Sequence, residues 1–144
     1  MPITPTALAS ELNTDPAGLG YAALIAAGND AGCAAKLNTP TATLGFRNDI
    51  AASEVIDAIP SADFATLTAL QLAKLQALFI GRATIDATKP NTRASFVAIF
   101  TGLPNTIAAL NTLAQRPYTR AEVLGGIGTA ESASDVGFAL RGSK

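Results

Sequence analysis

The sequence predicts an all-α protein, an irregular bundle of about six to eight short helices folded as a single helical domain over residues 1–144. Apolar residues recur at helical spacing along most of the chain, and short connectors rich in Gly, Pro and Asn separate these segments. No stretch alternates apolar and polar residues for long enough to indicate a strand. The composition agrees, because 49% of the residues are hydrophobic and only 6% aromatic, which favours small side chains between closely packed helices.

The first 40 residues predict three short helices. Thr4 followed by Pro5 has the form of an N-cap and a proline at the first helical position, so a helix begins there and covers about residues 5–13. A segment dense in turn-forming residues separates it from a second helix over residues 21–27. A third helix ends at Asn38, since the residue before the next proline avoids helical backbone.

The middle of the chain predicts the best-defined element. Residues 39–49 are expected to form a loop, and a short helix follows over residues 52–59. Thr68 and Gln71 have the spacing of a capping box, which predicts the start of a helix over about residues 69–80. Apolar side chains occupy almost its whole circumference, so we expect this helix to be central and buried.

Further helices are expected in the last third of the chain. Residues 92–101 predict a second largely buried helix, because aromatic and branched side chains cover much of its surface. A helix over about residues 106–115 follows. Thr119 and Glu122 repeat the capping-box spacing ahead of a short helical turn, and a last helix is expected over residues 135–141. The bundle is therefore predicted to wrap around the helices 69–80 and 92–101.

Missing residue types exclude several kinds of chemistry. The chain has no His, the commonest general base and nitrogen ligand of metals, and a single Cys, which forms neither an intrachain disulfide nor a multi-Cys metal site. Cys33 lies in a stretch of small residues that predicts a helix, where Cys usually acts as a small buried hydrophobe. A serine nucleophile would lack an imidazole to activate it.

Two carboxylate pairs at helical spacing remain as candidates for acid and base chemistry, Glu54 with Asp57 and Glu131 with Asp135. Near helix starts, however, carboxylates more often accept hydrogen bonds from the free backbone amides, and we favour that interpretation. The glycine-rich segment 125–129 lacks the strand and the Lys of a nucleotide-binding loop. The sequence therefore predicts a protein that is not an enzyme, with no catalytic residue, cofactor, metal site or small-molecule substrate.

The charge pattern bears on partners. Only 15% of the residues are charged and the net charge is -1, so we expect the chain to associate with itself or with other proteins and not to bind nucleic acid. No apolar run is long enough to cross a bilayer, and the first residues lack the pattern of a secretory signal, so no membrane association is expected. The candidate protein-contact residues are Arg116, Tyr118 and Arg120, because Arg and Tyr are enriched at protein interfaces; a solvated loop is the alternative.

Three short segments carry a resemblance to a group of known proteins. Residues 11–21 contain D-P-x-G-x-G-Y, residues 35–38 have the form A-x-L-N, and residues 116–125 contain T-R-A-E. In this order they resemble short helical proteins encoded by tailed bacteriophages and prophages. The resemblance implies a phage origin and a place among structural or assembly proteins. It transfers no functional residue to this chain.

These observations lead to one predicted function and one alternative. The predicted function is that of a non-enzymatic virion structural or assembly protein, associated with the head, connector or tail, made in the bacterial cytoplasm and located in the virion. Its partners would be other virion proteins or further copies of itself in a homo-oligomer. The alternative is a small phage-encoded regulator that binds a host protein.

Overall fold

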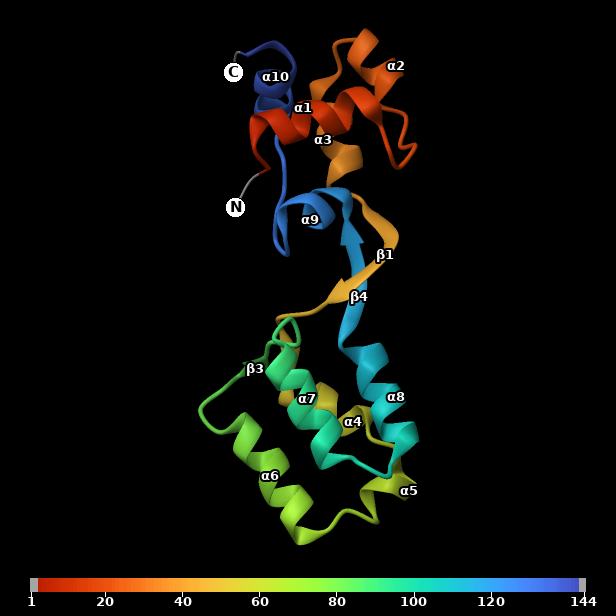
Figure 1. Cartoon of the computed structure of the whole chain (residues 1–144), viewed down its shortest axis with the longest axis vertical. Helices are drawn as coiled ribbons and strands as arrows, with labels where there is room; N and C mark the ends of the chain where they lie inside the picture. The colour runs from red at the N-terminus through yellow and green to blue at the C-terminus, as the bar shows by residue number, and fades with distance from the viewer. Residues whose placement is uncertain (1–2, 143–144) are drawn as a thin grey trace. The chain divides into compact units, whose positions relative to one another are not determined.

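The computed structural model of the chain describes residues 3–142 and shows a helix-rich mixed α/β protein (Figure 1). Within these residues there are ten helices and four strands, and the strands form two small antiparallel sheets. The prediction of an all-α fold is therefore wrong, because strands make up 11% of the structure. Residues 1–2 and 143–144, at the ends of the predicted domain, lie outside the described part.

The chain divides into two compact units, each of which is described by itself. Unit 1 comprises residues 1–44 and 117–144, and unit 2 comprises residues 45–116. The prediction of a single domain over residues 1–144 stays a prediction, because this division does not determine whether the units unfold together.

Unit 1 joins the two ends of the sequence in one group of helices. Its helices are α1 (Pro5–Thr14), α2 (Tyr21–Ala26), α3 (Asp30–Leu37), α9 (Arg120–Gly125) and α10 (Ala133–Arg141). Helix α10 packs against both α1 and α3. The predicted start of α1 is confirmed, since the hydroxyl oxygen of Thr4 accepts a hydrogen bond from the Ala7 N–H at 3.3 Å and Pro5 is the first helical residue.

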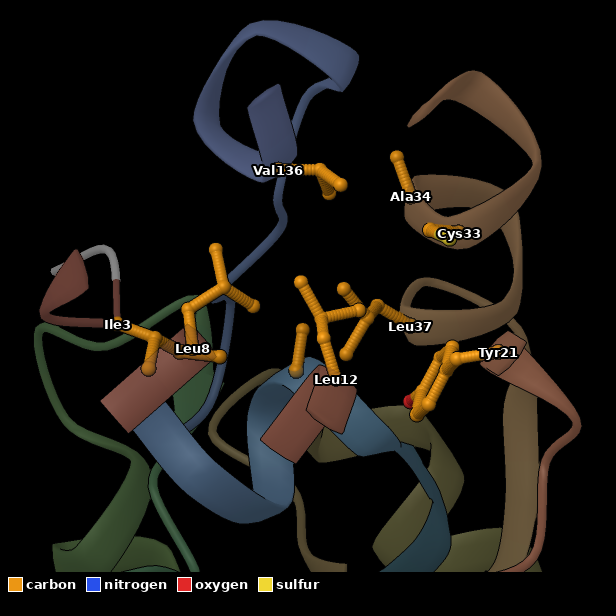
Figure 2. Packing of buried hydrophobic residues seen from close by; sticks show 9 residues of the cluster. Ile3, Leu8, Leu12, Tyr21, Cys33, Ala34, Leu37 and Val136 are labelled. Atoms are coloured by element: carbon orange, nitrogen blue, oxygen red, sulfur yellow. The ribbon is translucent and has the colours of Figure 1, made fainter. Parts of the chain in front are cut away.

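The core of unit 1 is closed and apolar. Figure 2 shows Leu8 and Leu12 from α1, Leu37 from α3 and Val136 from α10 gathered in one cluster, and none of them is more than 1% exposed. Cys33 is fully buried in the same cluster, and burial raises the pKa of its thiol. The interpretation of this residue as a small buried hydrophobe is confirmed.

The D-P-x-G-x-G-Y segment forms a turn that is organised by its first residue. Asp15 ends α1 with a φ of 44°, a left-handed conformation that Asp tolerates better than most residues. Its carboxylate accepts the N–H groups of Leu19 at 2.7 Å and Gly20 at 2.8 Å, just before α2 begins. Desolvation raises the pKa of Asp15, but these amide hydrogen bonds outweigh it and lower the pKa. The motif therefore joins two helices.

Unit 2 contains the helices from the middle of the sequence. They are α4 (Ala52–Ala58), α5 (Ser61–Phe64), α6 (Ala69–Phe79), α7 (Pro90–Ile99) and α8 (Pro104–Leu113) (Figure 1). The capping box predicted at Thr68 and Gln71 is confirmed at the start of α6. The core includes Val55, Leu75 and Phe100, which are at most 3% exposed.

The helices predicted at 69–80 and 92–101 exist as α6 and α7, but they are not the buried centre of a bundle. Leu75 is the single buried residue of α6, whereas Leu70 on the same helix is 64% exposed. In α7, Ile99 alone is buried. The physical reason is size, because a small unit buries a smaller share of its surface than a large domain and cannot surround a central helix.

The strands were missed for two reasons. Strand β1 (Pro40–Phe46) lies in the segment predicted as a loop, because Gly45 and Asn48 interrupt its β-favouring residues. It pairs with β4 (Gln115–Thr119), whose Pro117 normally argues against a strand. Both strands of a two-stranded sheet are edges, where proline is tolerated. Strands β2 (Ile50–Ala51) and β3 (Thr84–Ile85) pair antiparallel but are only two residues long, which is too short for any pattern to indicate.

Candidate functional site

Unit 2 contains an apolar groove between α7 and α8. Phe96 and Val97 contribute to one wall, and Ile107 and Leu110 to the other. The volume of the groove is about 360 Å³. This volume and the predominance of apolar lining are typical of binding sites in proteins.

The walls and the floor of the groove differ in their exposure. The floor includes Ile50, Val55 and Ile85, each at most 4% exposed. Side chains in the walls are only partly covered, and Val97 is 51% exposed. The core of unit 2 thus continues into a surface that the rest of unit 2 leaves uncovered. We define the groove by these residues of the floor and the walls.

Two side-chain hydrogen bonds fix the helices that form the walls. The Gln71 Nε2 of α6 donates to the Ile99 carbonyl at the end of α7, at 2.9 Å. The hydroxyl of Thr106 on α8 is fully buried and donates to the Asp63 carboxylate of α5 at 2.7 Å. Both bonds join segments far apart in sequence, so the walls are held by neighbouring helices and the groove exists before any partner binds.

The backbone of Arg47 joins two segments that line one end of the groove. Its backbone N–H donates to the Ala114 carbonyl, and its carbonyl accepts the Ala87 N–H, both at 2.8 Å. Its guanidinium forms a two-point contact with Glu54 at 3.1 and 3.2 Å, and this hydrogen bonding to Glu54 raises the pKa of Arg47. The Ala51 N–H and then Arg47 lower the pKa of Glu54. The capping interpretation of Glu54 is therefore confirmed, because the Ala51 amide at the start of α4 donates to its carboxylate at 2.9 Å.

Arg93 contributes the charged side chain of the groove lining. Its guanidinium carbon lies 4.0 Å from the centre of the Phe46 ring, a cation–π contact. Its Nη1 donates to the Ala87 carbonyl at 2.6 Å. Both contacts hold the guanidinium group in place. Thr92 and the exposed Asn111 add uncharged polar groups to the lining.

The predicted contact residues lie outside this groove. Arg116 and Tyr118 are in β4, two positions apart and so on one face of the strand, and Arg120 is the first residue of α9. All three are half-buried. Arg116 belongs to unit 2, and the other two belong to unit 1. The structure does not test their proposed role at an interface, which stays a prediction.

Arg120 has a clear structural partner inside unit 1. Its Nε and Nη2 donate to the two carboxylate oxygens of Glu11 at 2.7 and 2.8 Å. The side chain of Glu11 is 3% exposed and that of Arg120 is 18% exposed, so the pair is largely desolvated. Hydrogen bonding to Glu11 raises the pKa of Arg120. The Tyr21 hydroxyl also donates to Glu11, at 3.4 Å, and burial followed by the Glu11 charge raises the pKa of this phenol.

Of the other three carboxylates considered as catalytic candidates, Asp135 and Glu131 have structural partners, and Asp57 is exposed on α4. Asp135 accepts the Ser132 N–H at 3.0 Å and caps α10, as expected. Glu131 is 3% exposed, and its Oε1 accepts the Ile3 N–H at 2.8 Å. Its backbone is held by Asn38, which donates to the Glu131 carbonyl at 2.7 Å and accepts its N–H at 2.9 Å. The last residue of the A-x-L-N segment, Asn38, thus hydrogen-bonds to the backbone of Glu131, a distant part of the chain.

Sequence reasoning missed the groove and both arginines that border it. Arg47 lay in a segment predicted as a loop, and Arg93 in a helix predicted to be buried. The available signal was the apolar surface of two consecutive helices, each beginning with a proline. That signal cannot show whether the two surfaces meet each other or leave a groove between them.

Comparison with known proteins adds no relative. No protein-family model, curated protein or solved structure matches this chain. Within residues 3–142, no helix is long and apolar enough to span a bilayer. The same residues contain no group of three or more His, Cys, Asp or Glu side chains placed to hold a metal ion.

Proposed function

We propose that this chain is a non-enzymatic structural or assembly protein of a bacteriophage virion, associated with its head, connector or tail, and that it acts through protein–protein contacts made by the groove of unit 2. The groove between α7 and α8 is the observation that carries the proposal. It is apolar, preformed, and open along walls that include Val97, which is 51% exposed.

The physical argument concerns apolar surface left in contact with water. Covering such surface stabilises a complex by about 25 cal/mol for each Å² buried, before the costs of association. Groove walls held by Gln71 and Thr106 need little reorganisation when a partner binds. A preformed apolar groove between helices is a common way to recognise an amphipathic segment of another protein.

Two features of the sequence support the phage assignment and the reliance on contacts. The order of the three short segments resembles proteins of tailed bacteriophages, and only 15% of the residues are charged. A low charge leaves a free monomer with little protection against association. Assembly into a symmetric particle would cover such surface on every copy.

Photo-crosslinking in purified virions tests the proposal. Benzoylphenylalanine replaces Val97 in the groove wall, and in a matched variant it replaces Lys74, an exposed residue of α6 outside the groove. We expect the chain in the particle by mass spectrometry and a crosslink to a virion protein or a second copy from position 97, not from position 74. Absence of the chain from virions and assembly intermediates, or equal crosslinking from both positions, would contradict the proposal. A crosslink only to a host protein, with no chain in particles, would favour the regulator.

A further inference from the structure

The charge of the groove is positive and is carried by one side chain. Arg93 is the only charged residue that lines the groove in the described part of the chain. The residue is half-buried, so part of its side chain remains in contact with water. No carboxylate lines the groove beside it. A purely apolar partner, with no acidic group, would remove water from the Arg93 guanidinium without supplying an opposite charge. Such desolvation of an unpaired cation is unfavourable.

No carboxylate of the described chain neutralises Arg93, and this distinguishes it from Arg47 and Arg120. Arg47 contacts Glu54 and Arg120 contacts Glu11, in both cases with two nitrogens on two carboxylate oxygens. Among residues 3–142, no Asp or Glu forms an ion pair with Arg93, whose Nη1 instead donates to a backbone carbonyl. The Phe46 ring below holds the guanidinium plane in place. The remaining N–H groups of the Arg93 guanidinium form a fixed, positively charged set of hydrogen-bond donors.

We infer that the groove binds an acidic amphipathic segment of another protein, with an aliphatic or aromatic side chain between α7 and α8 and a carboxylate on Arg93. The inference rests on the proposed function, because it names the chemistry of the partner for the same groove. The carboxylate supplies the charge that the chain lacks at this position, through charge-assisted hydrogen bonds to a half-buried guanidinium. Segments that carry Lys or Arg beside the apolar side chain are rejected by like charge.

A protein segment fits this surface better than a small carboxylic acid, because the apolar surface extends beyond the groove. Ala94 and Ala98 are exposed at helical spacing around Val97 and belong to the same face of α7. Ala108 on the rim of α8 is also exposed. These small side chains let a second backbone approach closely along both walls. A ligand confined to the 360 Å³ of the groove would leave this surface in water.

Two related dyes test the charge preference on the full chain. Anilinonaphthalene sulfonate has an apolar aromatic body and one anionic group, and phenylnaphthylamine has the same body without the charge. Their affinities are measured by fluorescence for the unaltered chain, Arg93→Gln, Arg93→Lys and Arg82→Gln. Arg82 is an exposed arginine of the same unit that does not line the groove, so its variant controls for net charge.

We expect Arg93→Gln to weaken the sulfonate dye about 10- to 100-fold, the range for hydrogen bonds to charged groups, while phenylnaphthylamine binds as before. Arg93→Lys should keep part of the preference and Arg82→Gln all of it. Unchanged binding of the neutral dye shows that the groove of the variant is folded. If both dyes bind and Arg93→Gln weakens neither, the inference is overturned and the groove stands. If neither dye binds the unaltered chain, the groove itself and the proposed function fail.

The crosslinked virions identify the occupant. We expect the peptide crosslinked from position 97 to carry Asp or Glu within four residues of the crosslinked apolar residue. A peptide without an acidic residue there, or with Lys or Arg in its place, would overturn the inference while leaving the proposed function intact. So would a small carboxylic acid found in the groove by native mass spectrometry of the isolated chain.

Discussion

The two units differ in where they place polar and apolar side chains. Unit 1 contains four of the five buried polar residues of the described chain, and unit 2 contains one. Conversely, five of the eight large hydrophobic residues that are exposed belong to unit 2. Unit 1 therefore buries more polar groups, among which Glu131 keeps one carboxylate oxygen without a hydrogen-bond partner in the described chain, whereas unit 2 exposes more large apolar side chains. This difference underlies the proposal that the groove of unit 2 binds a partner.

The three motifs on which the predicted phage resemblance rests all contribute contacts inside unit 1. Asp15 joins α1 to α2, Asn38 fastens the backbone of Glu131, and Arg120 pairs with Glu11. Each motif connects parts of unit 1. None of the three motifs contributes a residue to the groove of unit 2.

The largest expected effect comes from breaking the buried ion pair of unit 1. Arg120→Ala leaves the Glu11 carboxylate buried without its partner, and we expect a loss of about 3–5 kcal/mol in the free energy of unfolding. Urea unfolding followed by labelling of Cys33 measures this loss in unit 1. The control is Arg141→Ala, which removes an exposed ion pair with Asp30 and should cost less than about 1 kcal/mol. Equal losses would show that burial does not distinguish the pairs.

Helix α6 offers a comparison within unit 2. Leu75→Ala removes a side chain that is 2% exposed and should cost about 2–5 kcal/mol. Leu70→Ala, on the same helix but 64% exposed, should change stability by less than about 0.5 kcal/mol. Thermal and urea unfolding give both values. Similar losses of stability for Leu75→Ala and Leu70→Ala would indicate that α6 is buried on all sides.

Thiol labelling compares the accessibility of the two units directly. Native Cys33 should react slowly, because it is fully buried and its pKa is raised. In a Cys33→Ala background, Val97→Cys places a thiol in the groove wall, and we expect it to react about 1000-fold faster if unit 1 opens at a cost of about 4 kcal/mol. Comparable rates in folded protein would mean that unit 1 is no more closed than the groove.

The smallest effect concerns alkaline pH. Tyr21 has a pKa raised above its ordinary value of about 10, first by burial and then by the Glu11 charge, so the folded state keeps a proton that the unfolded state loses. Its contribution is therefore complete below pH 10 and is lost as the pH rises further. Stability measured between pH 9 and about 11 should fall less steeply for Tyr21→Phe. The unaltered chain is the reference, and an identical slope for Tyr21→Phe would contradict the assignment.

Local signals in the sequence predicted local structure well. The cap at Thr4, the capping boxes at Thr68 and Thr119 and the buried state of Cys33 each depend on a few neighbouring residues, and all are confirmed. The predictions that failed depend on contacts between distant segments. The pairing of β1 with β4 and the position of α6 are properties of the folded chain.

The candidate site could not be predicted for the same reason. Arg120 attracted attention as a contact residue, but its partner Glu11 is 109 positions away and invisible to local spacing. Arg93 looked like part of a buried helix, and its value as a recognition group depends on Phe46 below it and on the absence of an acidic partner within the described residues. Sequence spacing identifies residue types, whereas the three-dimensional structure identifies which charges remain unpaired.

Methyl NMR of the full chain tests most directly the claim that ligands bind in the groove of unit 2 and not in the core of unit 1. Ile, Leu and Val methyl groups are labelled, and anilinonaphthalene sulfonate is added in steps. The account predicts shifts at Val97, Ile107 and Leu110 in the groove, with Leu8 and Leu12 in the core of unit 1 unchanged. Shifts concentrated in the core of unit 1, or spread evenly over both units, would contradict it.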